Sequence, residues 1–306
     1  MRRLFVLLLL LLCSPALGLR LVLLSDFNGS YGSTTYPAAV GRTVGRIVGE
    51  WKPDLVLSAG DLIAAQKASL GAAQLQAMWQ GFEQNVRGPL QNAGIPFAFA
   101  LGNHDASLAL DRHEAAAYWK NHVPELHFVD RANFPFWYSF VAQNVFVAVL
   151  DATGPKVGAE QRAWLAAQLA APVAQNARYR LVMGHLALAG ISREKNKVGE
   201  VIAEATALRA VLERGNVTAY IHGHHAAYYA GRLGKLQILS SGGIGGRDYV
   251  GFAGTARSVV TVLDVQEGQI KLTAYDADTG AVIPNSSLPP RIDGLGGPVF
   301  RVESLK

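Results

Sequence analysis

Short apolar runs alternate along the chain with longer segments whose apolar residues recur at helical spacing. The runs at 19–25, 54–59 and 95–101 end in polar residues or glycine and predict buried β-strands. The segments between them, 37–51 and 72–93, predict helices. Strand and helix alternation with largely apolar strands is typical of an α/β protein whose sheets are buried on both faces.

The second half of the chain continues this alternation and then becomes rich in strands. A hairpin is predicted over 136–150, and the later helices and strands are predicted at 158–171, 179–183, 201–214, 217–221, 236–240, 258–265 and 269–275. The segment 285–297 is rich in Pro, Gly and Ser and predicts a tail that packs on the surface or trails from the domain. We therefore expect one domain over 19–284 and a tail over 285–306.

The N-terminus has the order of features found in a secretory signal peptide. Arg2 and Arg3 precede the apolar run Leu4–Cys13, and Ala16–Gly18 provides a small-residue cleavage site. The apolar run is too short to span a bilayer, which needs about 20 apolar residues. We therefore predict a cleaved signal peptide over 1–18, an exported (periplasmic or secreted) protein, and no stable membrane span after cleavage. An uncleaved anchor and a buried first strand are the alternatives.

The composition limits which metal ligands and which partners the chain could have. Cys13 is the single cysteine, so the cleaved chain would have neither disulfides nor a thiolate metal site, and a metal would bind His, Asp, Glu or Asn. Half of the residues are hydrophobic, which is enough for a large core. Cleavage removes two bases and no acid, so the formal charge of +5 becomes +3. This weak charge without a dense basic block does not indicate a nucleic-acid partner, but it favours an anionic substrate.

Polar side chains follow five of the predicted strands at the point where each strand ends. They are Asp26, Asp61, the group Asn103, His104 and Asp105, then His185, and His224. Ligand sites in open α/β sheets lie beyond these strand ends. A glycine comes directly before four of the five positions, at Gly60, Gly102, Gly184 and Gly223. Glycine permits a sharp turn and a close approach to the backbone, so the pattern indicates a binding site.

The order of these motifs resembles the calcineurin-like metallophosphoesterase family. The motifs are Asp26, Gly60-Asp61, Gly102-Asn103-His104-Asp105, Gly184-His185 and Gly223-His224. Val149-Leu150-Asp151 with Gln161 and Trp164, and the glycine-rich turn Gly242–Gly246, resemble purple-acid-phosphatase-like members in particular. The resemblance covers residues 19 to about 275.

The resemblance implies a four-layer α/β/β/α sandwich of two mixed β-sheets flanked by helices. It further implies an enzyme that uses divalent metal ions, one or two of Mn, Fe or Zn, to hydrolyse small phosphate mono- or diesters. In the implied site Asp61 bridges two ions, Asp26 belongs to the first, and the second is completed by Asn103, His185 and His224. His104 would assist the leaving group, and Asp105 would orient His104.

Two positions depart from the family pattern, and both belong to the first metal site. Asn28 and Ala226 stand where the family has histidines. Asn28 would ligate through its carbonyl oxygen, with the remaining place filled by one of three substitutes, Tyr31, His222 or His225. Otherwise a single ion suffices, or the chain has lost catalysis and binds a metal or an anionic ligand.

Two further readings stay open at this point. An uncleaved N-terminus would make the chain a tethered structural protein of the cell envelope. Arg247, which follows the glycine-rich turn, is either a phosphate contact or a solvated surface arginine.

Overall fold

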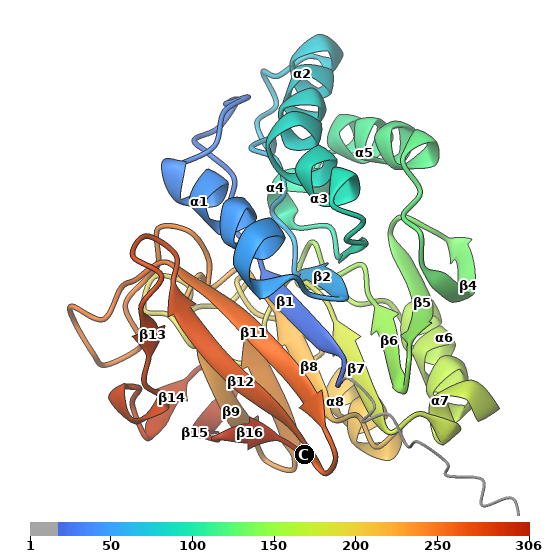
Figure 1. Ribbon diagram of the computed structural model, residues 1–306. Helices are drawn as coiled ribbons and strands as arrows, with labels where there is room; N and C mark the ends of the chain where they lie inside the picture. Colours follow the sequence, from blue (N-terminus) through green and yellow to red (C-terminus); the bar gives the residue numbers. More distant parts are fainter. Residues whose placement is uncertain (1–17) are drawn as a thin grey trace, which may run out of the picture.

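The computed structural model describes residues 18–306, so the predicted signal peptide lies outside the described residues apart from Gly18. Two β-sheets form the body of the molecule (Figure 1). In order across the sheet, the first contains β13 (Val282–Ile283), β12 (Gln269–Asp276), β11 (Val259–Gln266), β1 (Arg20–Leu24), β2 (Leu55–Ser58) and β3 (Phe97–Phe99), with β16 (Ser304–Leu305) also paired to β12. The second contains β14 (Arg291–Gly294), β15 (Gly297–Arg301), β9 (Tyr229–Leu233), β10 (Leu236–Ser240), β8 (Ala219–His222), β7 (Tyr179–Met183), β6 (Val145–Val149), β5 (Trp137–Ala142) and β4 (His127–Asn133).

Helices connect the strands and cover the outer faces of the sheets. The α-helices are α1 (Ala38–Arg46), α2 (Ala72–Phe82), α3 (Gly88–Asn92), α4 (Asn103–Ala106), α5 (Ala109–Asn121), α6 (Ala159–Ala170), α7 (Pro172–Asn176) and α8 (Ala205–Arg214). The π-helical turns η1 (Ile47–Trp51) and η2 (Glu83–Arg87) continue α1 and α2, and a 3₁₀ turn, η3, covers Asn285–Ser287. Among residues 18–306, none of the helices is both long and apolar enough to cross a membrane.

The side chains of β1 show how the layers form. Leu21 and Leu23 belong to the core between the two sheets, which also contains Phe140 of the second sheet. Val22 points to the other face, into the layer that contains Phe82 of α2. Because successive strand residues face opposite sides, an apolar strand buries both faces of its sheet. With α6 and α8 on the second sheet, the arrangement is the expected four-layer sandwich of two mixed sheets (Figure 1).

Parallel strands in both sheets explain how the predicted site residues are brought together. In the first sheet β1, β2 and β3 run parallel, and in the second β6, β7, β8 and β10 run parallel. The segments after β1, β2, β3, β7 and β8 carry the polar residues that the sequence singled out. These segments meet at one end of the sandwich, where the distances given below place their side chains in contact.

The structure differs from the predicted elements in several places. The helix predicted at 201–214 begins only at Ala205, because Val201 forms a β-bridge with Ala187 and the Ile202 N–H donates to the Ala187 carbonyl oxygen, which holds the chain out of a helical path. Helix α5 and strand β4 were not predicted. The sequence of α5 lacks an apolar stripe, and its Trp119 is held by stacking on Phe99 at 3.7 Å between ring centroids, a contact that tertiary packing provides.

The last residues take part in both sheets. Strands β14 and β15 extend the second sheet through the pairing of β15 with β9, and β16 pairs with β12 of the first. Residues 285–306 therefore contribute strands, and the predicted division at 284 stays a prediction.

Candidate metal centre

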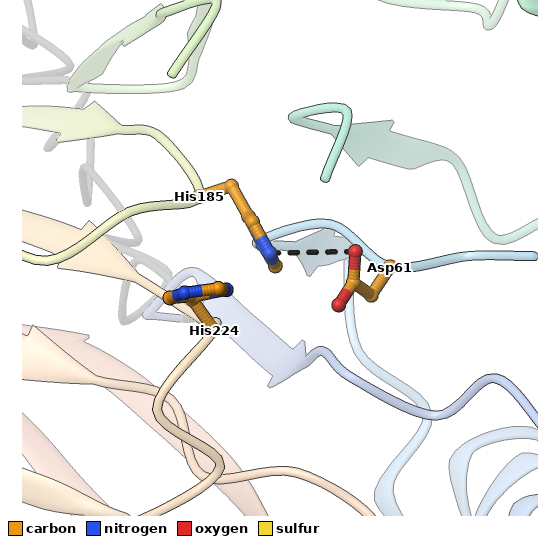
Figure 2. Close-up of side chains that lie close together, drawn as sticks. All are labelled: Asp61, His185 and His224. Carbon is orange, nitrogen blue, oxygen red and sulfur yellow. Dashed lines mark ion pairs between the residues drawn. The ribbon is translucent and has the colours of Figure 1, made fainter. Parts of the chain in front are cut away.

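Four side chains from four strand ends converge on one point. Asn103 Oδ1 lies 2.9 Å from His185 Nε2 and 2.8 Å from His224 Nδ1. His185 Nε2 lies 3.3 Å from Asp61 Oδ1. Figure 2 shows Asp61, His185 and His224 directed toward the same small volume, and one ligating atom from each lies within 4.8 Å of the others.

Hydrogen bonds on the outer side of each ring determine which nitrogen faces this volume. His185 Nδ1 donates to the Ala59 carbonyl oxygen at 2.7 Å, and His224 Nε2 donates to Glu200 Oε2 at 2.6 Å. A neutral imidazole has one N–H, so with the outer nitrogen protonated the inner nitrogen of each ring would present a lone pair to a metal, which at His185 takes the place of a proton. The Asn103 amide is oriented by its Nδ2, which donates to Gln66 Oε1 at 2.6 Å, so its carbonyl oxygen also faces inward. A cluster of lone pairs facing one another fits a cation.

The electrostatics of the cluster also favour a bound cation. Burial alone would lower the pKa of His185, but the negative charges of Asp61 and Asp26 outweigh it and raise the pKa to about 9. Burial lowers the pKa of His224 to about 4, so this ring is neutral at neutral pH and able to ligate. A position that binds a proton this strongly also favours a metal cation, and the donor set of one carboxylate, one amide and two imidazoles fits a divalent transition metal.

The backbone at the site adopts unusual conformations. Asp26, Asp61 and His224 all have positive φ, at 49°, 59° and 63°. Such conformations are costly for residues other than glycine and gather at functional sites. Gly102 allows the close approach that the sequence predicted, because a Cβ there would lie 2.2 Å from Asp61 Oδ1. The strand ends therefore pack too tightly for a side chain at this position.

Asp105 does not have the role that the family resemblance implied. Its carboxylate is fully buried and accepts backbone N–H groups from Asp61 (2.9 Å) and Gly102 (2.7 Å) on Oδ2, and from Leu62 (2.8 Å) and Ile63 (2.9 Å) on Oδ1. Both oxygens are thus saturated by the turns after β2 and β3. Asp105 positions the loop of Asp61 and makes no hydrogen bond to His104, so the predicted orienting contact is wrong.

His104 lies at the mouth of the cluster. Its backbone N–H donates to Asp61 Oδ1 at 2.9 Å, and its Nε2 lies 3.9 Å from Asp61 Oδ2. The Tyr31 ring packs against the His104 ring with 4.9 Å between centroids. Tyr31 is 55% exposed and its ring is tilted against that of His104, so its role as a substitute ligand stays a prediction.

The first metal site of the family is poorly formed. Asp26 Oδ2 accepts hydrogen bonds from Ser25 Oγ (2.6 Å) and the His224 N–H (3.0 Å), and burial raises the Asp26 pKa to about 6. The Asn28 side chain makes one long contact, from its Nδ2 to the Gly29 carbonyl oxygen at 3.5 Å. Over residues 18–306, the one group of His, Cys, Asp and Glu side chains able to hold a metal is Asp61, His185 and His224.

Two further histidines close to His224 in sequence, His222 and His225, lie outside the group of converging ligand atoms. His225 is fully buried; its Nδ1 accepts the backbone N–H groups of Ile191 (3.0 Å) and Ser192 (3.2 Å), and its Nε2 donates to the Glu200 carbonyl oxygen at 3.1 Å. Neither nitrogen is available, so His225 is not a substitute ligand. His222 is also fully buried and donates from Nδ1 to the Gly223 carbonyl oxygen, and it lies outside the metal-binding group.

Arg247 lies beside the site. Its Nη1 donates to the His224 carbonyl oxygen at 3.1 Å, and its positive charge lowers the Asp26 pKa, although burial of Asp26 has the larger and opposite effect. The guanidinium keeps further N–H groups, so the phosphate contact predicted for Arg247 stays a prediction.

Sequence reasoning missed two residues that hold ligands in place, Glu200 and Gln66. Glu200 lies in an irregular segment before α8, and Gln66 lies in the loop after β2. Neither directly follows a strand, so the strand-end pattern that revealed the ligands contained no signal for them.

Comparisons with known proteins identify the family and the fold of this chain. Residues 19–228 match the sequence profile of the calcineurin-like phosphoesterases. The fold is similar to that of a purple acid phosphatase from yellow lupin (Lupinus luteus) seeds, at 18% identity and a TM-score of 0.64, over 87% of this chain and 52% of the lupin chain. This chain thus spans about half the length of the lupin protein.

Two further solved structures are similar over most of both chains. A dimetal phosphatase from Danio rerio has 14% identity and a TM-score of 0.59, over 85% of this chain and 96% of its own. GAP50, the anchor in the inner membrane complex of Plasmodium, has 13% identity and a TM-score of 0.60, over 94% and 89%. No curated protein sequence matches this chain significantly. At these identities the structural matches show the fold alone.

Proposed function

Because this chain belongs to the calcineurin-like phosphoesterase family, we propose that it hydrolyses small phosphate mono- or diesters with a divalent metal ion held by Asp61, Asn103, His185 and His224. The observation that carries the proposal is the convergence of these four side chains, with the outer nitrogens of both rings already bonded. When bound, a divalent ion supplies polarisation of the phosphoryl oxygen and activation of water.

The residues of the chain then have separate tasks. Asp61, Asn103 and the two histidines would hold the ion, and His104, whose Nε2 lies 3.9 Å from Asp61 Oδ2, would supply a proton to the departing oxygen. Arg247 provides positive charge on the side of Asp26. The absence of a side chain at Gly102 lets the turns after β2 and β3 pack closely, which preorganises Asp61 and Asn103.

We expect one tightly bound ion per chain. Asn28 and Ala226 replace the two histidines of the first site, which leaves Asp26 as its one carboxylate besides the shared Asp61. Metal analysis of the purified protein by mass spectrometry measures the number directly. A content of two ions would contradict the single-ion proposal and show that waters or Asn28 complete the first site.

Hydrolysis is tested with p-nitrophenyl phosphate and its bis-ester after loading with Mn²⁺, Fe²⁺ or Zn²⁺. We expect turnover that is lost on chelation and in Asp61→Ala, because this variant removes a ligand to the ion. Equal and negligible rates for the wild type and for His104→Ala with every ion would instead favour an inactive relative that binds a metal or an anionic ligand.

Export is proposed from the N-terminal sequence. The charged, apolar and small-residue regions of 1–18 have the order of a signal peptide. N-terminal sequencing of protein recovered outside the cytoplasm is expected to begin at Leu19. A sequence beginning at Met1 would contradict cleavage and support a tethered protein.

A further inference from the structure

One buried histidine ties both ends of the segment 191–200 to the metal centre. His225 accepts the N–H groups of Ile191 and Ser192 at one end and donates to the Glu200 carbonyl oxygen at the other. All three bonds are made by a ring that is fully buried. Because His225 follows His224 directly in sequence, these bonds hold the segment beside the ligand His224. The bond from His225 Nε2 fixes the backbone of Glu200.

The Glu200 side chain is held from two directions. Its Oε2 accepts from His224 Nε2 at 2.6 Å and from Lys195 Nζ at 2.9 Å. Lys195 lies in the same anchored segment, so one part of the chain supplies both the carboxylate and the cation that steadies it. The His224 side chain is 6% exposed and that of Glu200 is 24% exposed, so water reaches this hydrogen bond less than it reaches a surface ion pair.

We propose that Glu200 is a positioning residue that fixes the tautomer of His224 and so presents its Nδ1 lone pair to the metal. The inference rests on the proposed metal site. A carboxylate that accepts the Nε2–H keeps the proton on the outer nitrogen, which leaves Nδ1 free to ligate. In the other tautomer Nδ1 would carry the proton and point it at the site.

The geometry excludes Glu200 as a ligand of the same ion. Its carboxylate contacts Nε2, whereas Asn103 Oδ1 contacts Nδ1 of the same ring at 2.8 Å. The imidazole ring therefore separates Glu200 from the other ligating atoms. Its effect on the metal passes through His224. The two consecutive histidines thus have different roles. His224 is the ligand, and His225 anchors the segment whose Glu200 orients His224.

The test compares Zn²⁺ affinity in the wild type, Glu200→Ala and Glu200→Gln, measured by competition with a chromophoric chelator. We expect about 10- to 100-fold weaker binding in Glu200→Ala, the range seen when a carboxylate behind a metal-bound histidine is removed. Glu200→Gln is expected to retain most of the affinity, because its amide oxygen still accepts the Nε2–H. Glu194→Ala is the matched control, since Glu194 lies in the same segment but pairs with the exposed Arg193. Wild-type affinity in Glu200→Ala would overturn the proposal.

A second measurement separates this inference from the proposed function. ¹⁵N NMR of the histidine rings in metal-free protein reports which nitrogen of His224 is protonated. We expect Nε2–H in the wild type and in Glu200→Gln, and a mixture of tautomers in Glu200→Ala. Nδ1–H in the wild type would overturn the proposal even if the protein binds Zn²⁺. If the wild type binds no Zn²⁺, the proposed function fails and the inferred role toward the metal fails with it, although the tautomer result still shows whether Glu200 sets the ring.

Discussion

Replacing Asp105 by asparagine is expected to destabilise the protein and to weaken metal binding, although Asp105 touches no ligating atom. Each Asp105 oxygen accepts two backbone N–H groups, one pair from Asp61 and Gly102 and the other from Leu62 and Ile63. An asparagine of the same shape offers one oxygen, and its NH₂ group would face two N–H donors. Leaving two buried donors without acceptors costs about 2–6 kcal/mol.

The loss extends to the metal because the Asp61 loop depends on these bonds. Asp61 holds a positive φ of 59°, a conformation that persists where surrounding contacts enforce it. We expect Zn²⁺ affinity to fall about 10- to 100-fold in Asp105→Asn, as for other residues that support ligands. Thermal unfolding of the metal-free protein and chelator competition measure the two effects separately.

Asp276→Asn is the matched control for this prediction. Asp276 also accepts N–H groups, from Asp278 at 3.0 Å and Thr279 at 2.8 Å, but both go to the same oxygen, Oδ1, in an exposed turn after β12. An asparagine there can accept both, so stability and affinity should stay near the wild-type values. Unchanged stability and metal affinity in Asp105→Asn would contradict the proposed role of Asp105 in holding the Asp61 loop.

The ligands could be predicted from the sequence because their positions depend mainly on where each parallel strand ends. A parallel strand fixes where its carboxyl end lies, so a polar residue directly after an apolar run is placed by the sheet. Asp61 follows Ser58 at the end of β2 by three residues, and His185 follows Met183 at the end of β7 by two. The fold class could be predicted for the same reason, since apolar runs of strand length between helical segments leave few arrangements.

The supporting residues could not be predicted in this way. The direction of the Asp105 carboxylate depends on how the turns after β2 and β3 face each other, which is a contact across 44 residues of sequence. Glu200 reaches His224 only because His225 anchors the intervening segment. Such contacts arise from tertiary packing, and the local pattern of apolar and polar residues does not predict them. The orienting contact implied for Asp105 and the ligand role considered for His225 were therefore the predictions that the structure corrected.

Replacing His104 by alanine is expected to reduce hydrolysis without removing the metal. Its Nε2 lies 3.9 Å from Asp61 Oδ2, and its side chain is 20% exposed, so it borders the site and is accessible to a substrate. Loss of a general acid lowers the rate by about 10²–10⁴-fold. Zn²⁺ affinity should remain close to that of the wild type, because the four proposed ligands are intact.

The dependence on the leaving group identifies what His104 does. An alkoxide leaving group needs a proton as the P–O bond breaks, whereas p-nitrophenolate departs readily as an anion. The loss in His104→Ala should therefore be larger for methyl phosphate than for p-nitrophenyl phosphate. His113→Ala, which removes an exposed histidine of α5, serves as the control and should retain wild-type rates. Equal losses for both substrates would mean that His104 orients the phosphoryl group through Asp61, and that the proton comes from elsewhere.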